Sequence, residues 1–274
     1  MALVWRNDHH SSARFQKRKT VSIRKTQEEI VMRNYQEEFD KRVEWIRNLV
    51  KSAGCKGIIY GNSGGKDSAL VGILCKAACE DTVGIIMPCA SKRNYQEDMK
   101  DGIDVADQFQ IAYRVVDLTK VRETLLEEVC KAADSLSDPA ISNIAPRLRM
   151  TTLYAIGQSE GRLVAGTGNA DELYVGYYTK YGDGGVDFNP IGDLNVSEVY
   201  EFLNWLNAPE NIRTKAPSAG LFDGQTDEKE MGIKYDEIDE FLTTGKTNPE
   251  AQEKIERMHS RSEHKRIGTR FYPN

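Results

Sequence analysis

The feature that most restricts the fold of this chain is a glycine-rich loop between a short apolar run and a helical pattern. The run at 57–60 reads GIIY, which is typical of a buried strand, and the loop at 61–68 reads GNSGGKDS. From 67 to 79 apolar residues recur on one helical face. Glycines let a backbone approach an anion, and a helix N-terminus directs free N–H groups at it. The string therefore predicts a phosphate-binding loop rather than a strand-to-helix turn without a ligand.

The loop differs from the common P-loop, GxxxxGK[ST], because it contains an acid, Asp67. A carboxylate beside phosphates is stable when a metal ion lies between them, and Mg²⁺ prefers one or two carboxylates together with phosphate oxygens. We therefore expect Asp67 to bind Mg²⁺. The alternative is an acid at a helix N-terminus that is favoured only by the helix dipole.

The following sequence alternates between strand and helix patterns. Strand patterns cover 57–60, 82–87, 113–118 and 162–165, and helix patterns cover 26–50, 67–79, 95–109, 121–133 and 144–158. This alternation predicts an α/β fold, a doubly wound parallel sheet with helices on both faces. Ligands of such sheets bind at the carboxyl ends of the strands, which is where the glycine-rich loop falls.

After residue 166 the pattern becomes irregular. Glycines, acids and tyrosines are mixed between 168 and 185, which predicts a long functional segment without regular structure. Further on we expect a helix over 196–206 capped by Ser197 or Asn195, a loop over 215–234, and short helices over 236–242 and 249–258.

Composition excludes several classes of protein. No apolar run approaches the roughly 20 residues that cross a bilayer, and a net charge of −5 argues against a dedicated nucleic-acid binder. The five cysteines form no CxxC pair, so we expect buried free thiols in a reducing, cytoplasmic environment. Residues 1–25 are basic and lack the apolar core of a secretory signal, so we expect a basic arm there, mobile or bound to a partner, and a single domain over 26–274.

The string SGGKDS at 63–68 resembles the pyrophosphate loop of the N-type ATP pyrophosphatases. That superfamily includes NAD synthetase, GMP synthetase, asparagine synthetase, argininosuccinate synthetase and tRNA-thiolating enzymes. Its members adenylate an oxygen of their substrate and release pyrophosphate. The loop alone does not distinguish among them.

Later motifs favour one member of the superfamily. The strings PRLRM at 146–150, GTGNADE at 166–172, TKYGDGGVD at 179–187, PSA at 217–219 and EHKR at 263–266 are similar, in this order, to segments of the NAD synthetases. The chain thus resembles that family over most of its length. The resemblance implies a fold of the adenine nucleotide alpha hydrolase type and a homodimer.

The resemblance also implies roles for particular residues. Those implied to bind ATP are Gly61, Asn62, Ser63, Gly64, Gly65, Lys66, Asp67, Ser68, Thr167 and Ser218. Those implied to bind deamido-NAD are Arg147, Lys180, Asp187, His264 and Lys265. Glu172 is implied to complete the Mg²⁺ site with Asp67. Outside these motifs, Arg147, Lys180 and Glu172 would be ordinary surface charges, and the pair at 264–265 part of a solvated tail.

One position departs from the family pattern. The family usually has an ATP-contacting lysine after its PxxxL segment, which here is PIGDL at 190–194. Val196 stands at the lysine's position and cannot donate to phosphate. Either another cation, such as Lys66 or Lys215, compensates, or ATP is held through one contact fewer.

The implied reaction is the last step of NAD biosynthesis, catalysed by a ligase with Mg²⁺ as cofactor and ATP as co-substrate. The nicotinate carboxylate of deamido-NAD attacks the α-phosphate of ATP, pyrophosphate leaves, and ammonia then replaces AMP to give NAD⁺. No residue is assigned as a general acid or base, because positioning and charge stabilisation would supply most of the rate. The sixty residues before Gly61 are too few for the glutaminase domain of glutamine-dependent relatives, so we expect free ammonia, with a separate glutaminase as the alternative.

Two other functions compete with this one. A tRNA-thiolating enzyme would need catalytic cysteines or a nucleic-acid platform, and its product would be modified tRNA. A nucleotide-binding module without catalysis would release no pyrophosphate, and a pair of metal-binding acids argues against it. We expect no nucleic-acid or membrane partner. The helix before the first strand either contributes to the homodimer interface or only covers the sheet.

Overall fold

The computed structural model describes residues 33–89, 94–215 and 227–272 of the chain. Residues 31–274 belong to one compact unit. The basic arm expected over 1–25 lies outside the described residues, so the division into an arm and a single domain over 26–274 remains a prediction.

A four-stranded parallel sheet with the strand order β3-β2-β1-β4 forms the centre of this unit. Its strands are β1 (Gly57–Gly61), β2 (Thr82–Ile86), β3 (Ala112–Val115) and β4 (Arg162–Ala165). The chain runs outward from β1 through β2 to β3 and then returns to the other side of β1. The strand order therefore reverses between β1 and β4, where sheets of this kind bind ligands.

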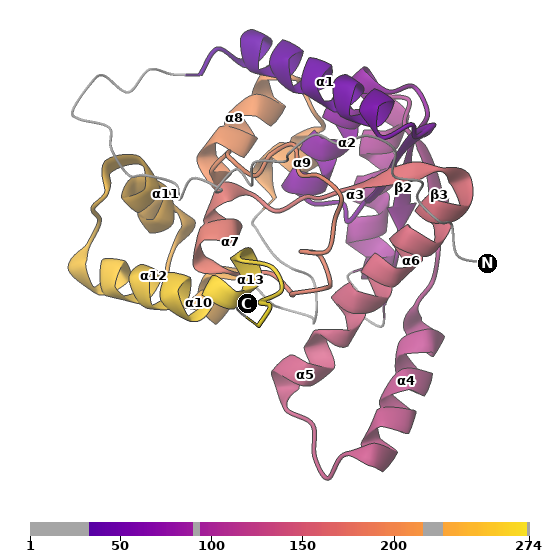
Figure 1. Cartoon of the computed structure of the whole chain (residues 1–274). Coiled ribbons are helices and arrows are strands. Elements are labelled where there is room, and N and C mark those ends of the chain that lie inside the picture. The colour runs from indigo at the N-terminus through magenta and orange to yellow at the C-terminus, as the bar shows by residue number, and fades with distance from the viewer. Residues whose placement is uncertain (1–32, 90–93, 216–226, 273–274) are drawn as a thin grey trace. The chain divides into compact units, whose positions relative to one another are not determined.

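Helices cover both faces of the sheet (Figure 1). They are α1 (Tyr35–Ser52), α2 (Lys66–Ala78), the π-helical turn η1 (Asn94–Asp98), α3 (Met99–Gln108), α4 (Thr119–Ala132), α5 (Asp138–Ser142), α6 (Ile144–Glu160), α7 (Ala170–Val175), α8 (Val196–Trp205), α9 (Glu210–Thr214), α10 (Asp227–Met231), α11 (Tyr235–Thr244), α12 (Pro249–Arg261) and α13 (Glu263–Arg266). The predicted α/β fold class is confirmed.

Alternation along β1 explains the two layers. Ile58 and Tyr60 are fully buried in one core with α1, α2, α3 and α8, whereas Ile59 is fully buried in the other with α6. Successive side chains of a strand point to opposite faces, so one apolar strand supplies both cores. A third apolar cluster joins α7 and α8 to α10, α11 and α12.

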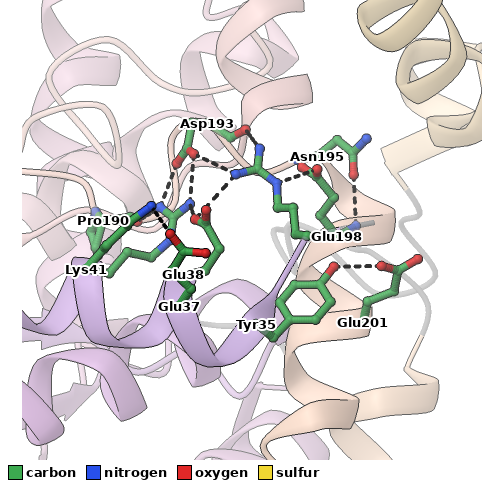
Figure 2. A network of polar contacts seen from close by, with 11 residues as sticks. Tyr35, Glu37, Glu38, Lys41, Pro190, Asp193, Asn195, Glu198 and Glu201 are labelled. Carbon is green, nitrogen blue, oxygen red and sulfur yellow. Dashed lines mark hydrogen bonds and ion pairs between the residues drawn. The ribbon is translucent and has the colours of Figure 1, made fainter. Parts of the chain in front are cut away.

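Helix α1 packs on the first core through Val43, Ile46 and Val50, so its apolar stripe covers the sheet. A polar network then ties α1 to the segment before α8 (Figure 2). Arg42 binds both carboxylate oxygens of Asp193, at 2.6 and 2.7 Å. The Leu194 carbonyl next to Asp193 accepts the first N–H of α7, from Ala170, at 2.7 Å. The network therefore supports the helix on which Glu172 lies.

Some local predictions were wrong. Strand β3 ends at Val115, three residues early, because Leu118 already turns into the core before α4. Within the segment predicted to be irregular lies α7, and within the loop expected over 215–234 lies α10. Cys130 is exposed on α4, against the expectation of buried thiols. None of the described helices is long and apolar enough to cross a membrane.

Candidate active site

The glycine-rich loop connects β1 to α2 and has the conformation that its glycines predict. Gly64 has φ +69°, and a Cβ there would lie 2.0 Å from the Asp98 carbonyl oxygen, so only glycine fits. Asn62 fastens the loop to α3 by donating from Nδ2 to the Gly102 carbonyl at 2.9 Å. Lys215 donates from Nζ to the Gly64 carbonyl at 3.2 Å. The loop is therefore held from two sides.

The two acids expected to bind metal lie on the first turns of α2 and α7, which follow the neighbouring strands β1 and β4. Asn169 connects them. Its Nδ2 donates to Asp67 Oδ1 at 3.2 Å, and its Oδ1 accepts the Glu172 N–H at 3.0 Å. Glu172 accepts the Asn169 N–H in return, which completes a capping box. The motif N-x-x-E thus caps the start of α7 and also positions the Glu172 side chain.

Asp67 and Glu172 have one buried positive charge beside them, that of Lys66. Lys66 Nζ lies 2.6 Å from Asp67 Oδ2 and is 5% exposed. Burial lowers the pKa of Lys66, but Asp67 and Glu172 outweigh this and raise it, so the side chain stays charged. Burial and the neighbouring Asp67 raise the pKa of Glu172 well above its usual range. Two carboxylates with one lysine between them leave an excess of negative potential, which favours a bound cation.

A cavity of about 620 Å³ opens beside these groups. The predicted residues that line it are Gly61, Asn62, Ser63, Gly65, Lys66, Asp67, Ser68, Arg147, Thr167, Glu172, Lys180, His264 and Lys265. Residues from the phosphate loop and from the later motifs therefore share one cavity, as a reaction between two substrates requires.

The basic residues expected to bind deamido-NAD lie close to one another in the lining of this cavity. Arg147 on α6 is exposed, and its Nη2 lies 3.4 Å from the Lys180 carbonyl oxygen. Lys180 donates from Nζ to the His264 carbonyl at 2.5 Å. Lys265 donates to the carbonyls of Gly176 and Tyr178. Burial lowers the pKa of Lys265, while Asp183 acts in the opposite direction.

Two of the predicted residues that the structure describes do not line the cavity. Asp187 lies beside β4, where its carboxylate accepts the Val164 N–H at 2.8 Å and the Tyr154 hydroxyl at 3.0 Å. Gly64 shapes the loop without lining the cavity. Ser218 lies outside the described residues.

Other cavity residues had no assigned role in the sequence. Asp183 lies inside the glycine-rich signature and accepts the Thr179 N–H at 3.0 Å. Arg149, two residues after Arg147, donates to the Met87 carbonyl at the end of β2 at 3.1 Å. Asp183 and Arg149 both lie within motifs that resemble segments of the NAD synthetases. Their place in these motifs is the sequence signal that could have identified them. Asp227 and Glu230 also line the cavity, but they come from the stretch that the sequence predicts to be a loop.

Val196 does not reach toward a phosphate. Its side chain is 5% exposed and packs in the third apolar cluster, and its N–H donates to Asp171 Oδ2 at 2.7 Å. Of the two cations considered as substitutes, Lys215 is already paired with Asp98 and Asp101, each at 2.7 Å.

The parallel sheet and the glycine-rich loop at its switch point define an α/β nucleotide-binding protein. Residues 38–269 match the model of the NAD synthase family. The chain belongs to the NAD synthase family.

Relatives and solved structures agree with this assignment. The chain is 46% identical over 235 residues to the ammonia-dependent NAD⁺ synthetase of Carboxydothermus hydrogenoformans, covering 85% of this chain and 96% of the relative. It is 41% identical over 239 residues to that of Archaeoglobus fulgidus, covering 85% and 95%. The structure of NMN synthetase from Francisella tularensis superposes with a TM-score of 0.83 at 36% identity, covering 89% and 100%. The ammonia-dependent NAD synthetase of Campylobacter jejuni gives 0.70 at 28%, covering 88% and 100%.

Proposed function

We propose that this protein is an ammonia-dependent NAD⁺ synthetase that adenylates the nicotinate carboxylate of deamido-NAD and then amidates it. The observation that carries the proposal is the shared cavity, which is lined both by the phosphate loop and by the basic residues of the dinucleotide motifs. Relatives that match nearly their whole length to this chain are ammonia-dependent NAD⁺ synthetases. Ammonia is therefore the nitrogen source in this proposal.

In the first step a carboxylate oxygen of the nicotinate forms a bond to the α-phosphorus of ATP. The bond between this phosphorus and the bridging oxygen of the β-phosphate breaks, and pyrophosphate leaves. The N–H groups at the start of α2, with Ser63 and Ser68, donate to the departing phosphates. Arg147 and Lys180 hold the anionic second substrate in line with ATP.

In the second step the nitrogen of ammonia attacks the activated carbonyl carbon. The carbon–oxygen bond to the adenylate breaks, AMP leaves with both electrons of that bond, and the nitrogen gives up a proton. The protein contributes position and exclusion of water, since hydrolysis of the adenylate would waste ATP.

Mg²⁺ fits the donors that the cavity offers. Across 33–89, 94–215 and 227–272, no three His, Cys, Asp or Glu side chains lie close enough to hold a metal by themselves. A site with two carboxylates, Asp67 and Glu172, is instead suited to an ion that takes its remaining ligands from phosphate and water. Bound there, Mg²⁺ would neutralise charge on the leaving pyrophosphate.

Lys66 is the cation that we assign in place of a lysine at position 196. Its Nζ lies 5.9 Å from the centre of the Tyr200 ring and 5.6 Å from that of Tyr235. Tyr200 is one turn after Val196 on α8, so the Lys66 ammonium lies near the helix on which the family's lysine would stand. Lys66 lines the cavity, whereas Val196 is buried in the third apolar cluster. Lys215 remains paired with Asp98 and Asp101, and it supports the phosphate loop by donating to the Gly64 carbonyl.

We propose a homodimer formed through β3 and α4. Helix α4 has no buried residue, and exposed apolar side chains continue from the edge strand onto it: Tyr113, Val115, Val121 and Leu125. Both α4 and α5 extend from the rest of the unit (Figure 1). An exposed apolar edge of this kind is typical of an interface. Sedimentation of the wild type should give a dimer, and Val121→Asp with Leu125→Asp a monomer.

One observation favours testing a second candidate substrate beside deamido-NAD. The Francisella structure that superposes at 0.83 is an NMN synthetase, so its product lacks the adenylyl half of NAD. The corresponding candidate here is nicotinic acid mononucleotide. Turnover with equal concentrations of this acid and of deamido-NAD would decide, and we expect deamido-NAD to be preferred. In either case we place the enzyme in the cytoplasm, where ATP is available.

Turnover on ATP, Mg²⁺ and deamido-NAD, with ammonia or glutamine as nitrogen donor, tests the proposal. We expect NAD⁺, AMP and pyrophosphate in equal amounts with ammonia, and little product with glutamine. Asp67→Asn and Glu172→Gln should each lower kcat at least about a hundredfold. Normal turnover in both variants would show that the metal assignment is wrong, and the absence of pyrophosphate in the wild type would favour a passive nucleotide-binding module.

A further inference from the structure

The backbone carbonyls in the last turn of α7 accept hydrogen bonds from side chains near the C-terminal end of the described residues. The final carbonyls of a helix have no partner within the helix and must be satisfied from outside. Here the Tyr174 carbonyl accepts from Arg266 Nη1 at 3.0 Å and contacts His259 Nδ1 at 2.8 Å. The Val175 carbonyl accepts from Ser262 Oγ at 3.2 Å, and the Gly176 carbonyl from Lys265 Nζ at 2.6 Å.

Arg266 occupies the centre of this arrangement. Besides Tyr174, its Nη1 donates to Ser262 Oγ at 2.7 Å and approaches the Leu173 carbonyl at 3.5 Å, and its Nη2 donates to the His259 carbonyl. One planar guanidinium thus joins α7 to the end of α12. A lysine ammonium, which is a point charge on a flexible stem, cannot form this set of contacts simultaneously.

The packing leaves α7 little freedom to move. Gly176 has φ +74°, and a Cβ there would lie 2.1 Å from Ser262 Cβ, so the Gly176 backbone packs directly against the Ser262 side chain. Helix α7 has only six residues, and a helix of that length is not stable by itself. Its position is therefore determined by its caps, and a shift at its last turn also moves its first turn, where Glu172 lies.

We propose that Arg266 is a positioning residue for the metal site, which sets the place of Glu172 by holding the C-terminal end of α7. This rests on the proposed function, in which Glu172 and Asp67 bind Mg²⁺. Lys265, its neighbour, is implied to contact deamido-NAD, whereas Arg266 faces the helix and acts through it. Helix α13 thereby serves both halves of the cavity.

The test is a titration of the purified full-length protein with Mn²⁺, followed by electron paramagnetic resonance, without nucleotide. Arg266→Met removes the guanidinium, and Arg266→Lys keeps a charge but not the planar fork. Arg270→Met is the matched control, because Arg270 is exposed on the same segment and forms a surface pair with Glu263 at 3.1 Å. Glu172→Gln measures the contribution of the ligand itself. Circular dichroism establishes that each variant is folded.

We expect the Mn²⁺ dissociation constant to rise roughly three- to tenfold in Arg266→Met, to rise less in Arg266→Lys, and to stay at the wild-type value in Arg270→Met. The half-saturating Mg²⁺ concentration for turnover should follow the same order. If Glu172→Gln weakens Mn²⁺ binding but both folded Arg266 variants bind like the wild type, the positioning role is refuted and the proposed function stands. If Glu172→Gln itself binds Mn²⁺ normally, both are refuted. Should Arg266→Met not fold, the lysine variant alone decides between these outcomes.

Discussion

Asn169 donates from its side chain to Asp67 across 102 positions of sequence, with 3.2 Å between Nδ2 and Oδ1. The same side chain caps the helix that carries Glu172. One amide therefore fixes the distance between the two acids of the proposed metal site. Asn169 is also completely buried, so the connection is shielded from competing water.

Asn169→Ala should weaken both functions of this side chain. The lost cap costs about 1 kcal/mol of the free energy of unfolding, and the lost contact frees Asp67, so the half-saturating Mg²⁺ concentration should rise. Asn169→Asp retains a capping oxygen but places a third carboxylate beside Asp67. Urea unfolding and Mg²⁺ titration separate the effects: the aspartate variant should be nearer to the wild type in stability than the alanine variant, while its nucleotide binding is impaired. Equal Mg²⁺ dependence in all three proteins would contradict the connecting role.

The substitution of Lys66 tests whether the phosphate loop carries the cation that position 196 lacks. Lys66→Met should raise the KM for ATP by about tenfold or more, since a buried charge that faces phosphate is lost. Steady-state kinetics on the wild type and Lys66→Met would measure this. An unchanged KM for ATP in Lys66→Met would place the compensating contact elsewhere.

Tyr60 offers a prediction about stability alone. Its hydroxyl is fully buried in the first core and has no hydrogen-bond partner among the residues that the structure describes, and burial raises its pKa. An unsatisfied buried hydroxyl is unfavourable, so Tyr60→Phe should increase the free energy of unfolding by about 1 kcal/mol. Denaturant unfolding at neutral pH measures the change. A loss of stability would reveal a partner for this hydroxyl.

The pair of acids Asp171 and Asp239 predicts how stability depends on pH. Burial, and then the neighbouring Asp239, raise the pKa of Asp171 to about 9. Within the described part of the chain, each residue has one buried oxygen without a partner unless a proton is shared between them. The folded state therefore binds one proton more than the unfolded state from about pH 4 upward, and the free energy of unfolding falls as pH rises toward 9.

Asp239→Asn should flatten this dependence, since an amide can donate to Asp171 without a titrating proton. Between pH 6 and pH 8 the wild type should lose up to about 2.7 kcal/mol more stability than the variant, since one extra bound proton changes the free energy of unfolding by about 1.4 kcal/mol per pH unit. Urea unfolding at both pH values, with the difference taken between the two proteins, removes contributions from other groups. Parallel slopes would mean that the pair does not hold a proton.

The sequence predicted the parts of this fold that depend on local pattern. The apolar runs at 57–60 and 162–165 placed β1 and β4, and the loop between Gly61 and Ser68 followed from its glycines. Helix α7 was missed because six residues are too few to show helical periodicity. Its capping motif, Asn169 followed three residues later by Glu172, was nevertheless readable in the sequence.

Contacts between distant segments could not be predicted in this way. Arg266 meets the Tyr174 carbonyl across 92 positions, and nothing in the spacing of either residue indicates the other. Asp187 illustrates the reverse case, since its motif implied a substrate contact while the fold places its carboxylate on Val164 and Tyr154. Motifs indicate which chemistry is present, whereas the direction of each side chain depends on tertiary packing.

The most direct measurement of the central claim follows an oxygen atom. Deamido-NAD labelled with ¹⁸O in its nicotinate carboxylate is converted with ATP, Mg²⁺ and ammonia, and the products are analysed by mass spectrometry. Attack of the carboxylate on the α-phosphorus predicts one ¹⁸O atom in AMP for each NAD⁺ formed, with unlabelled pyrophosphate. Label in inorganic phosphate together with ADP, or AMP without label, would contradict adenylation of the carboxylate in this cavity.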